Sequence, residues 1–134
     1  MPTLLELLIT ASGLVSTTYG VHGELFCGDV GKPRPCSYGA ITASGDIFDP
    51  QLATAAVAAP TRTRIRPTVV YLRVDSGPCH RILVNDKMNP KWIGERGFDL
   101  TPAAVQLLTG KPATRHWSGV VHVCSVPYEL VVNK

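Results

Sequence analysis

The sequence predicts a mainly β domain, folded as a compact barrel with one or two short helices. Its 134 residues fit a single domain. Hydrophobic residues make up 45% of the chain and charged residues 17%, which favours a buried core over disorder. The 12 glycines and 11 prolines break long helices and favour short strands joined by turns. A formal net charge of +3 and 7% aromatic residues do not indicate a nucleic-acid-binding surface.

The N-terminal segment contains an apolar stretch at residues 4–15. This stretch has no Lys or Arg before it and contains Glu6, so it does not resemble an export signal. We interpret it as mature protein, an amphipathic helical turn that packs on the domain or on a partner. The chain has no run of 18 apolar residues, so no membrane-spanning helix is predicted.

The clearest strand signals lie in the second half of the chain. Ile65 and residues 69–74 predict a strand with a bend or an edge at Pro67. The turn at residues 75–78 joins that run to residues 80–86, which predicts a hairpin. Residues 119–124 predict another strand, and residues 130–132 are a further candidate.

Helical signals occur in two places. One is the alanine-rich run at residues 50–59. The other is residues 101–108, where Thr101 is a suitable N-cap, Pro102 occupies the first helical position and Gly110 ends the helix. Short strands with two small helices favour a barrel over a sandwich.

The sequence is compatible with more than one chemical state of its four cysteines. Their spacing matches no zinc-binding template. Two disulfides, with Cys27–Cys36 the most natural local pair, and reduced core cysteines are equally compatible with the sequence; a metal or iron–sulfur site is less so. The remaining two are Cys79 and Cys124.

Acidic residues near strand ends and turns are the candidate chemical groups. Asp86 follows an apolar run, Asp99 precedes Thr101, and Asp46 and Asp49 lie in a turn. Structural roles compete with catalytic ones at each position. Asp99 can favour a helix N-terminus, Asp86 can cap the turn at Asn89, and Asp46 and Asp49 can form the turn itself.

Several short segments, in the same order along the chain, resemble the rare-lipoprotein-A-like double-psi β-barrel family. They are SYG at 37–39, TASGDIFDP at 42–50, ATAA at 53–56, TRTRIR at 61–66, VND at 84–86 and FDLT at 98–101, followed by Ala103 and Ala104. The stretch from VNDKMNP to GFDLT is also similar to expansins.

The resemblance implies a six-stranded double-psi β-barrel at residues 36–126, with residues 1–35 as an irregular N-terminal extension and residues 127–134 as a tail. It also implies a lytic transglycosylase that cleaves the β-1,4 bond between N-acetylmuramic acid and N-acetylglucosamine in peptidoglycan. Such an enzyme needs one carboxyl group with a raised pKa.

The implied site has two classes of residue, and no metal or cofactor is expected. By position in the family motifs, Asp86 is the first candidate for the general acid and base, and Asp99 is the second. Tyr38, Asp46 and Asn85 are expected to line the groove and bind sugar.

One departure from the family pattern favours an alternative function. The family has a histidine at the end of its TAAH motif, and we align Val57 with it. A barrel without that histidine can be a non-catalytic structural or glycan-binding domain. The absence of an export signal suggests a phage tail tip, or a dedicated secretion machine, as the route to the bacterial cell envelope. In that setting residues 1–35 would dock on neighbouring virion or secretion-machine subunits.

Two further groups have competing interpretations. Arg62, Arg64 and Arg66 alternate, which suits either a charged strand edge that resists aggregation or an anionic-ligand patch. Trp92 and Trp117 suit sugar stacking, core packing or a partner interface.

Overall fold

A computed structural model describes residues 2–18, 26–27, 34–35, 42–49, 51–112 and 117–126, with backbone alone at 26–27 and 34–35. The predictions for Tyr38, the strand at 130–132, the tail at 127–134 and the Cys27–Cys36 pair lie outside this description. The elements in chain order are α1 Leu4–Ala11, β1 Val15–Thr18, β2 Phe26–Cys27, β3 Arg34–Pro35, β4 Thr54–Ala58, β5 Thr68–Val74, β6 His80–Met88, the short 3-10 helix η1 Pro90–Trp92, β7 Phe98–Leu100, α2 Pro102–Thr109 and β8 Ser118–Ser125.

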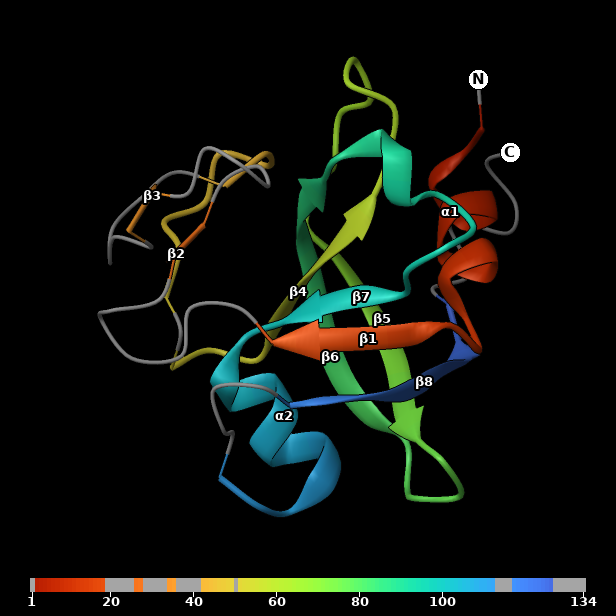
Figure 1. Cartoon of the computed structure of the whole chain (residues 1–134), viewed down its shortest axis with the longest axis vertical. Helices are drawn as coiled ribbons and strands as arrows, with labels where there is room; N and C mark the ends of the chain where they lie inside the picture. The colour runs from red at the N-terminus through yellow and green to blue at the C-terminus, as the bar shows by residue number, and fades with distance from the viewer. Residues whose placement is uncertain are drawn as a thin grey trace.

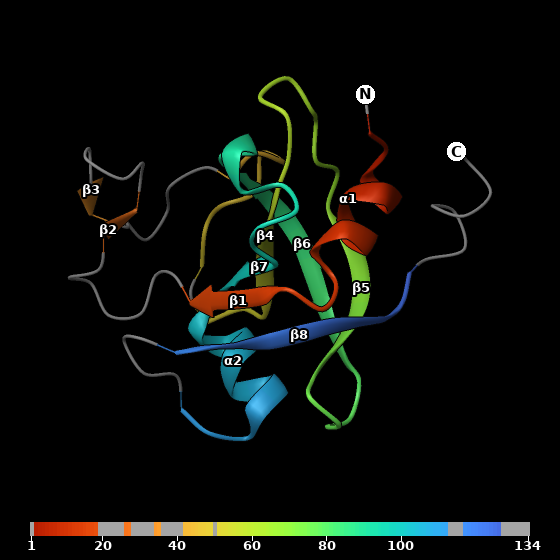
Figure 2. The same ribbon diagram turned by 45° about the vertical axis from the view of Figure 1, so that its right-hand side comes forward.

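The mainly β prediction is confirmed, and six strands form one sheet (Figure 1). The strand order is β1-β7-β4-β6-β5-β8. β1 also pairs antiparallel with β8, so the sheet closes on itself, and Figure 2 shows these two strands side by side. β2 and β3 form a separate two-stranded sheet.

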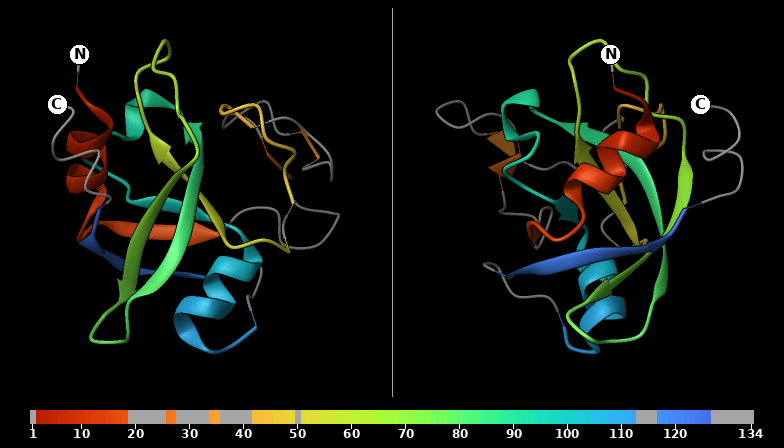
Figure 3. Two further views of the ribbon diagram at one scale, coloured as in Figure 1. Left: turned by 180° about the vertical axis from the view of Figure 1, so that it is seen from behind. Right: turned by 90° about the vertical axis from the view of Figure 1, so that its right-hand side faces the viewer.

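The predicted hairpin is confirmed as β5 and β6, which pair antiparallel over five positions from Thr68↔Val84 to Leu72↔His80 (Figure 3). β5 begins directly after Pro67, because proline cannot donate a ladder hydrogen bond. Ile65, which was expected to belong to the same strand, instead lies buried before it. β8 likewise confirms the strand predicted at residues 119–124.

The expectation that residues 1–35 form an extension outside the sheet is wrong for its first half. α1 buries Leu5, Leu7, Leu8 and Ala11, and three of these belong to the hydrophobic core. β1 then pairs with both β7 and β8 and closes the sheet. Most apolar residues of α1 are therefore covered by the same chain, while Ile9 and Val15 stay exposed, and a docking role is not needed to explain the buried ones.

The alanine-rich run is a strand and not the predicted helix. β4 is buried at all five positions between β6 and β7. Small side chains tolerate this crowded position, so tertiary packing overrides the helix propensity of alanine.

The second predicted helix is confirmed. Thr101 accepts a hydrogen bond from the N–H of Ala104 (3.2 Å), Pro102 begins α2, and Gly110 ends it with a left-handed φ of 74°. Thr101 is fully buried, and its hydroxyl also accepts from the N–H of Thr54 (3.1 Å) and so joins α2 to β4.

The two helices lie at opposite ends of the closed sheet (Figure 3). Apolar side chains from the strands fill the space between them, including Val57, Val70, Leu72, Ile82 and Phe98. None of the helices in the described part of the chain has the length and apolarity that crossing a membrane requires.

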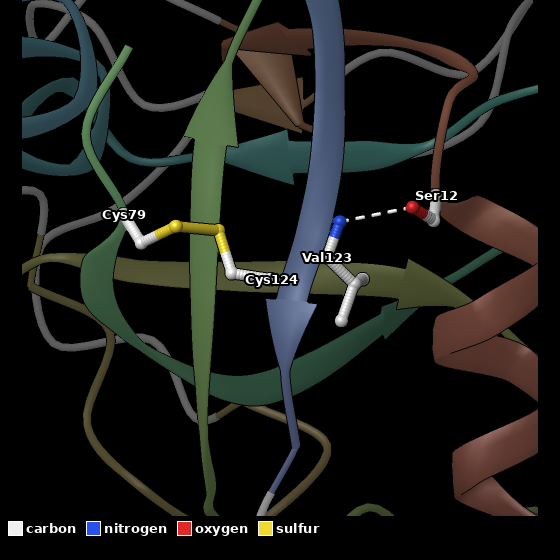
Figure 4. The surroundings of a disulfide bond; sticks show 4 residues. All are labelled: Ser12, Cys79, Val123 and Cys124. Carbon is white, nitrogen blue, oxygen red and sulfur yellow. Dashed lines mark hydrogen bonds between the residues drawn. A yellow bond between two sulfur atoms is a disulfide. The ribbon is translucent and has the colours of Figure 1, made fainter. Parts of the chain in front are cut away.

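A disulfide joins Cys79 to Cys124 across β5 (Figure 4). Cys79 directly precedes β6, and Cys124 lies on β8, so the bond connects the two neighbours of β5. For these two residues the disulfide alternative is therefore confirmed, and Cys79–Cys124 is the bond that remains when Cys27 and Cys36 form the local pair favoured by the sequence.

Candidate functional site

Three adjacent strands bring Asp86 and Asp99 to the same face of the sheet. Ala56 of β4 is in register with Asp86 of β6 on one side and with Asp99 of β7 on the other. The neighbours Ala55, Val57, Phe98 and Leu100 all belong to the core, so alternation turns Ala56 and Asp99 away from it, although Ala56 is itself only 3% exposed. The pairing of β4 with β6 shifts between Ala55 and Ala56, so Ala55 pairs with Val84 and Ala56 with Asp86. The two aspartates are thus separated by two strand spacings, about 10 Å between their Cα atoms.

The backbone fixes one oxygen of Asp86. Its Oδ1 accepts hydrogen bonds from the N–H of Ala43 and from that of Lys87, both at 2.9 Å. Because an N–H group can only donate, a proton on Asp86 must reside on Oδ2. No hydrogen bond joins Oδ2 to another residue in the described part of the chain. Asp86 does not cap the turn at Asn89, which is the structural role that the sequence also allowed. Asn89 itself caps η1.

A side-chain hydroxyl fixes Asp99. Thr17 Oγ1 donates to Asp99 Oδ1 at 2.6 Å, and the two residues are in register on β1 and β7. The N-cap of α2 is provided by Thr101, so Asp99 does not serve as a cap.

Both carboxyl groups have a raised pKa. For Asp86 burial is the largest cause, opposed by the N–H groups of Ala43 and Lys87 and by the charge of Lys87. For Asp99 burial again raises the pKa most, and the nearby Asp86 raises it further, whereas Thr17 and Arg96 lower it. A raised pKa keeps a carboxyl group protonated at higher pH, which is what a proton donor requires.

An aromatic and cationic cluster lies beside Asp99. The guanidinium of Arg96 stacks over the ring of Trp92 at 4.1 Å, and the ammonium of Lys91 lies 5.0 Å from the same ring. Trp92 is half-buried and lies outside the core, whereas Trp117 packs against the core. The core interpretation is therefore confirmed for Trp117, and sugar stacking remains a prediction for Trp92.

A turn at residues 42–46 covers one side of Asp86. Ser44 N–H donates to the carbonyl of Asn85 (3.1 Å), and Asn85 Nδ2 donates to Asp46 Oδ2 (3.3 Å). Asn85 is 3% exposed, and its Oδ1 has no hydrogen-bond partner among the described residues. Asp46 and Asn85 therefore lie next to Asp86, while Asp49 forms a turn by accepting from the N–H of Gln51.

The strand register bears on Val57, the residue that we aligned with the histidine of the family motif. Val57 is fully buried and belongs to the core, so a histidine at this position would not face the carboxyl groups. The position between them is that of Ala56.

Sequence reasoning missed three residues of this site. Thr17 lies in the segment that was set aside as an extension, Ala56 in the run predicted as helix, and Arg96 in a loop without a motif. Strand pairing between distant segments makes Thr17 and Ala56 neighbours of Asp99, and no local sequence motif predicts this pairing.

No protein-family model matches this chain, and neither a curated protein nor a solved structure matches it significantly. Among the described residues, no group of three or more His, Cys, Asp or Glu side chains is arranged to hold a metal ion.

Proposed function

We propose that this protein is a double-psi β-barrel that cleaves the glycan strands of bacterial peptidoglycan, as a lytic transglycosylase does. One observation carries the proposal: two carboxyl groups with raised pKa values lie on β6 and β7, in register with Ala56 on the intervening strand β4. Partly desolvated carboxyl groups of this kind are suited to acid catalysis on a glycosidic bond.

In the proposed reaction Asp86 acts twice. Its Oδ2 first gives its proton to the glycosidic oxygen, and the bond between that oxygen and C1 of the muramic acid breaks. The resulting carboxylate then accepts the proton of the 6-hydroxyl of the same sugar while that oxygen bonds to C1. The product has a 1,6-anhydro ring, and Asp86 recovers its proton without consuming water.

The presence of two carboxyl groups on separated strands supports a second candidate reaction, hydrolysis with inversion. Inverting glycosidases place their two carboxyl groups about 6.5–9.5 Å apart, and retaining enzymes about 5–5.5 Å apart. The intervening strand β4 keeps the Cα atoms of Asp86 and Asp99 two strand spacings apart, about 10 Å, which is compatible with the wider arrangement. In this reaction Asp99 would activate the water molecule.

A non-catalytic glycan-binding barrel is the alternative from a different class. Ala56 favours it, because a methyl group between the carboxyl groups offers no further group to orient sugar or move a proton. A location at the bacterial cell envelope is part of both proposals. The disulfide between exposed Cys79 and Cys124 supports it, since disulfides persist in oxidising compartments. Association with a phage tail remains a proposal of its own.

The test is digestion of purified peptidoglycan followed by mass spectrometry of the soluble products. The protein is compared with Asp86→Asn, Asp99→Asn and the control Asp75→Asn. Asp75 is exposed in the β5–β6 turn with a φ of 50°, a conformation that asparagine also tolerates.

Each outcome selects one function. Products with 1,6-anhydro ends that disappear in Asp86→Asn and persist in Asp75→Asn support the transglycosylase. Reducing-end products that require both Asp86 and Asp99 support inverting hydrolysis. Retention of the protein on the glycan without any product supports the binding barrel and contradicts an enzyme.

A further inference from the structure

Positive charge is concentrated between β4 and β5. Residues 50–74 contain four arginines and no acidic residue, although the formal net charge of the whole chain is only +3. Three of these arginines, Arg62, Arg64 and Arg66, lie in the connection before β5, which we call the arginine loop (residues 61–66).

Protection of a strand edge does not account for these arginines. Arg62, Arg64 and Arg66 lie outside every strand. The strands on either side have no free edge, because β4 pairs with β6 and β7, and β5 pairs with β6 and β8. A charged edge is useful only where backbone groups are unpaired.

The arginine loop is held in place by several contacts. Lys87 Nζ donates to the carbonyl oxygens of Thr61 and Thr63. Thr68 Oγ1 donates to the carbonyl of Arg66 at 2.8 Å. Ile65 is 2% exposed and belongs to the core, so its side chain anchors the loop to the core.

This anchoring leaves the three arginine side chains exposed. No described residue forms an ion pair with any of them. Lys87, which holds the loop, directly follows Asp86, so the arginine loop lies beside the candidate site.

We propose that the arginine loop is a binding surface for an anionic polymer, recognised through its phosphate or carboxylate groups. Arginine presents a planar fork of N–H donors that matches both kinds of oxyanion. A loop held by Lys87 and Ile65 loses little conformational freedom when it binds. Binding requires neither Asp86 nor Asp99 and so does not depend on the proposed cleavage reaction.

The experiment measures binding of the full chain to poly(glycerol phosphate), to polygalacturonate and to neutral dextran, at low and at moderate salt. The test variant is Arg62→Gln/Arg64→Gln/Arg66→Gln. The control, Arg73→Gln/Arg81→Gln/Lys111→Gln, removes the same formal charge from other elements. A third variant replaces the loop arginines by lysine.

We expect binding to one or both anionic polymers, none to dextran, and weaker binding at higher salt. The test variant should bind about tenfold more weakly or worse, since three ion pairs are removed, while the control stays near the original affinity. The lysine variant should bind better than the glutamine variant, because it keeps the charge. Preference for phosphate or carboxylate then identifies the polymer class.

Three results would overturn the proposal. The first is no binding to either anionic polymer. The second is an equal loss in the test and control variants, which would indicate a general effect of net charge. The third is a clear preference for DNA or RNA over both polymers, which would identify nucleic acid as the ligand.

Discussion

At the scale of single residues, the candidate site depends on opposing effects on two carboxyl groups. Burial disfavours the charged form of Asp99, and the hydroxyl of Thr17 favours it. Asp86 has the same opposition, with two backbone N–H groups in place of the hydroxyl. Each aspartate is thus positioned by one oxygen, while its environment raises its pKa.

Replacing Thr17 by valine should raise the pKa of Asp99 further, because the hydrogen bond that favours the carboxylate is lost. Thr17→Ser keeps the hydroxyl and should leave the pKa near its original value. The measurement is an NMR titration of the carboxyl carbon of Asp99. An unchanged titration in Thr17→Val would show that Thr17 does not control this group.

The raised pKa of Asp99 also makes the stability of the fold depend on pH. A carboxyl group whose pKa is higher in the folded than in the unfolded state stabilises the fold fully below its ordinary pKa, and this contribution is lost as the pH rises through the folded pKa. Asp99→Asn should therefore unfold at a higher temperature than the original protein at about pH 7 and show little difference at about pH 3. Thermal unfolding at both pH values tests this. The control Asp75→Asn removes an exposed carboxyl group from a turn, and an equal gain there would contradict the explanation.

At the scale of elements, α1 shows how a segment acquires its role from packing. Its side chains close one end of the sheet, and Ser12 just beyond it accepts a hydrogen bond from the N–H of Val123 on β8 at 2.9 Å (Figure 4). Gly97, before β7, approaches the same region so closely that a Cβ would lie 2.4 Å from Ser16 Oγ. The start of β7 therefore requires glycine.

Substitutions in α1 test whether this helix belongs to the folded domain. Leu8 is fully buried, and Leu8→Ala should lower the free energy of unfolding by about 2–5 kcal/mol. Ile9, the next residue, is 59% exposed, and Ile9→Ala should change it by less than about 0.5 kcal/mol. Urea unfolding measures both. Equal small effects would mean that α1 is dispensable for the fold.

At the scale of the whole molecule, closure joins the ends of the described chain. β1 and β8, more than 90 residues apart, pair from Val15↔Val120 to Thr17↔Ser118. The pairing of β6, β4, β7 and β1 aligns Asp86, Ala56, Asp99 and Thr17 in one row across the sheet. The candidate site is thus a consequence of how the sheet closes.

The disulfide should reinforce this closed arrangement. Cys79 and Cys124 are 45 residues apart, so the bond restricts a long segment of the unfolded chain. Cys79→Ser/Cys124→Ser should lower the free energy of unfolding by about 2–4 kcal/mol. The measurement is denaturant unfolding under non-reducing conditions. Reductant should destabilise the original protein by breaking the Cys79–Cys124 bond, an effect that the double variant cannot show.

Features with local signals were predictable from the sequence. Thr101, Pro102 and Gly110 determine where α2 begins and ends, because capping depends on residues within one turn of the helix. The β5–β6 hairpin follows from two apolar runs and the turn between them. Asp86 and Asp99 could also be named, since short motifs surround them.

Other features were decided only by the tertiary structure. Residues 54–58 form a strand because the sheet buries them on every side, a constraint that alanine content does not reveal. Thr17 becomes the partner of Asp99, and Ala56 comes to lie between Asp99 and Asp86, through pairing of strands far apart in the chain. The sequence by itself determined the β class, the hairpin, α2 and the two aspartates, because these depend on neighbouring residues. The closed sheet and the assembly of the site depend on long-range pairing and burial, which only the folded chain supplies.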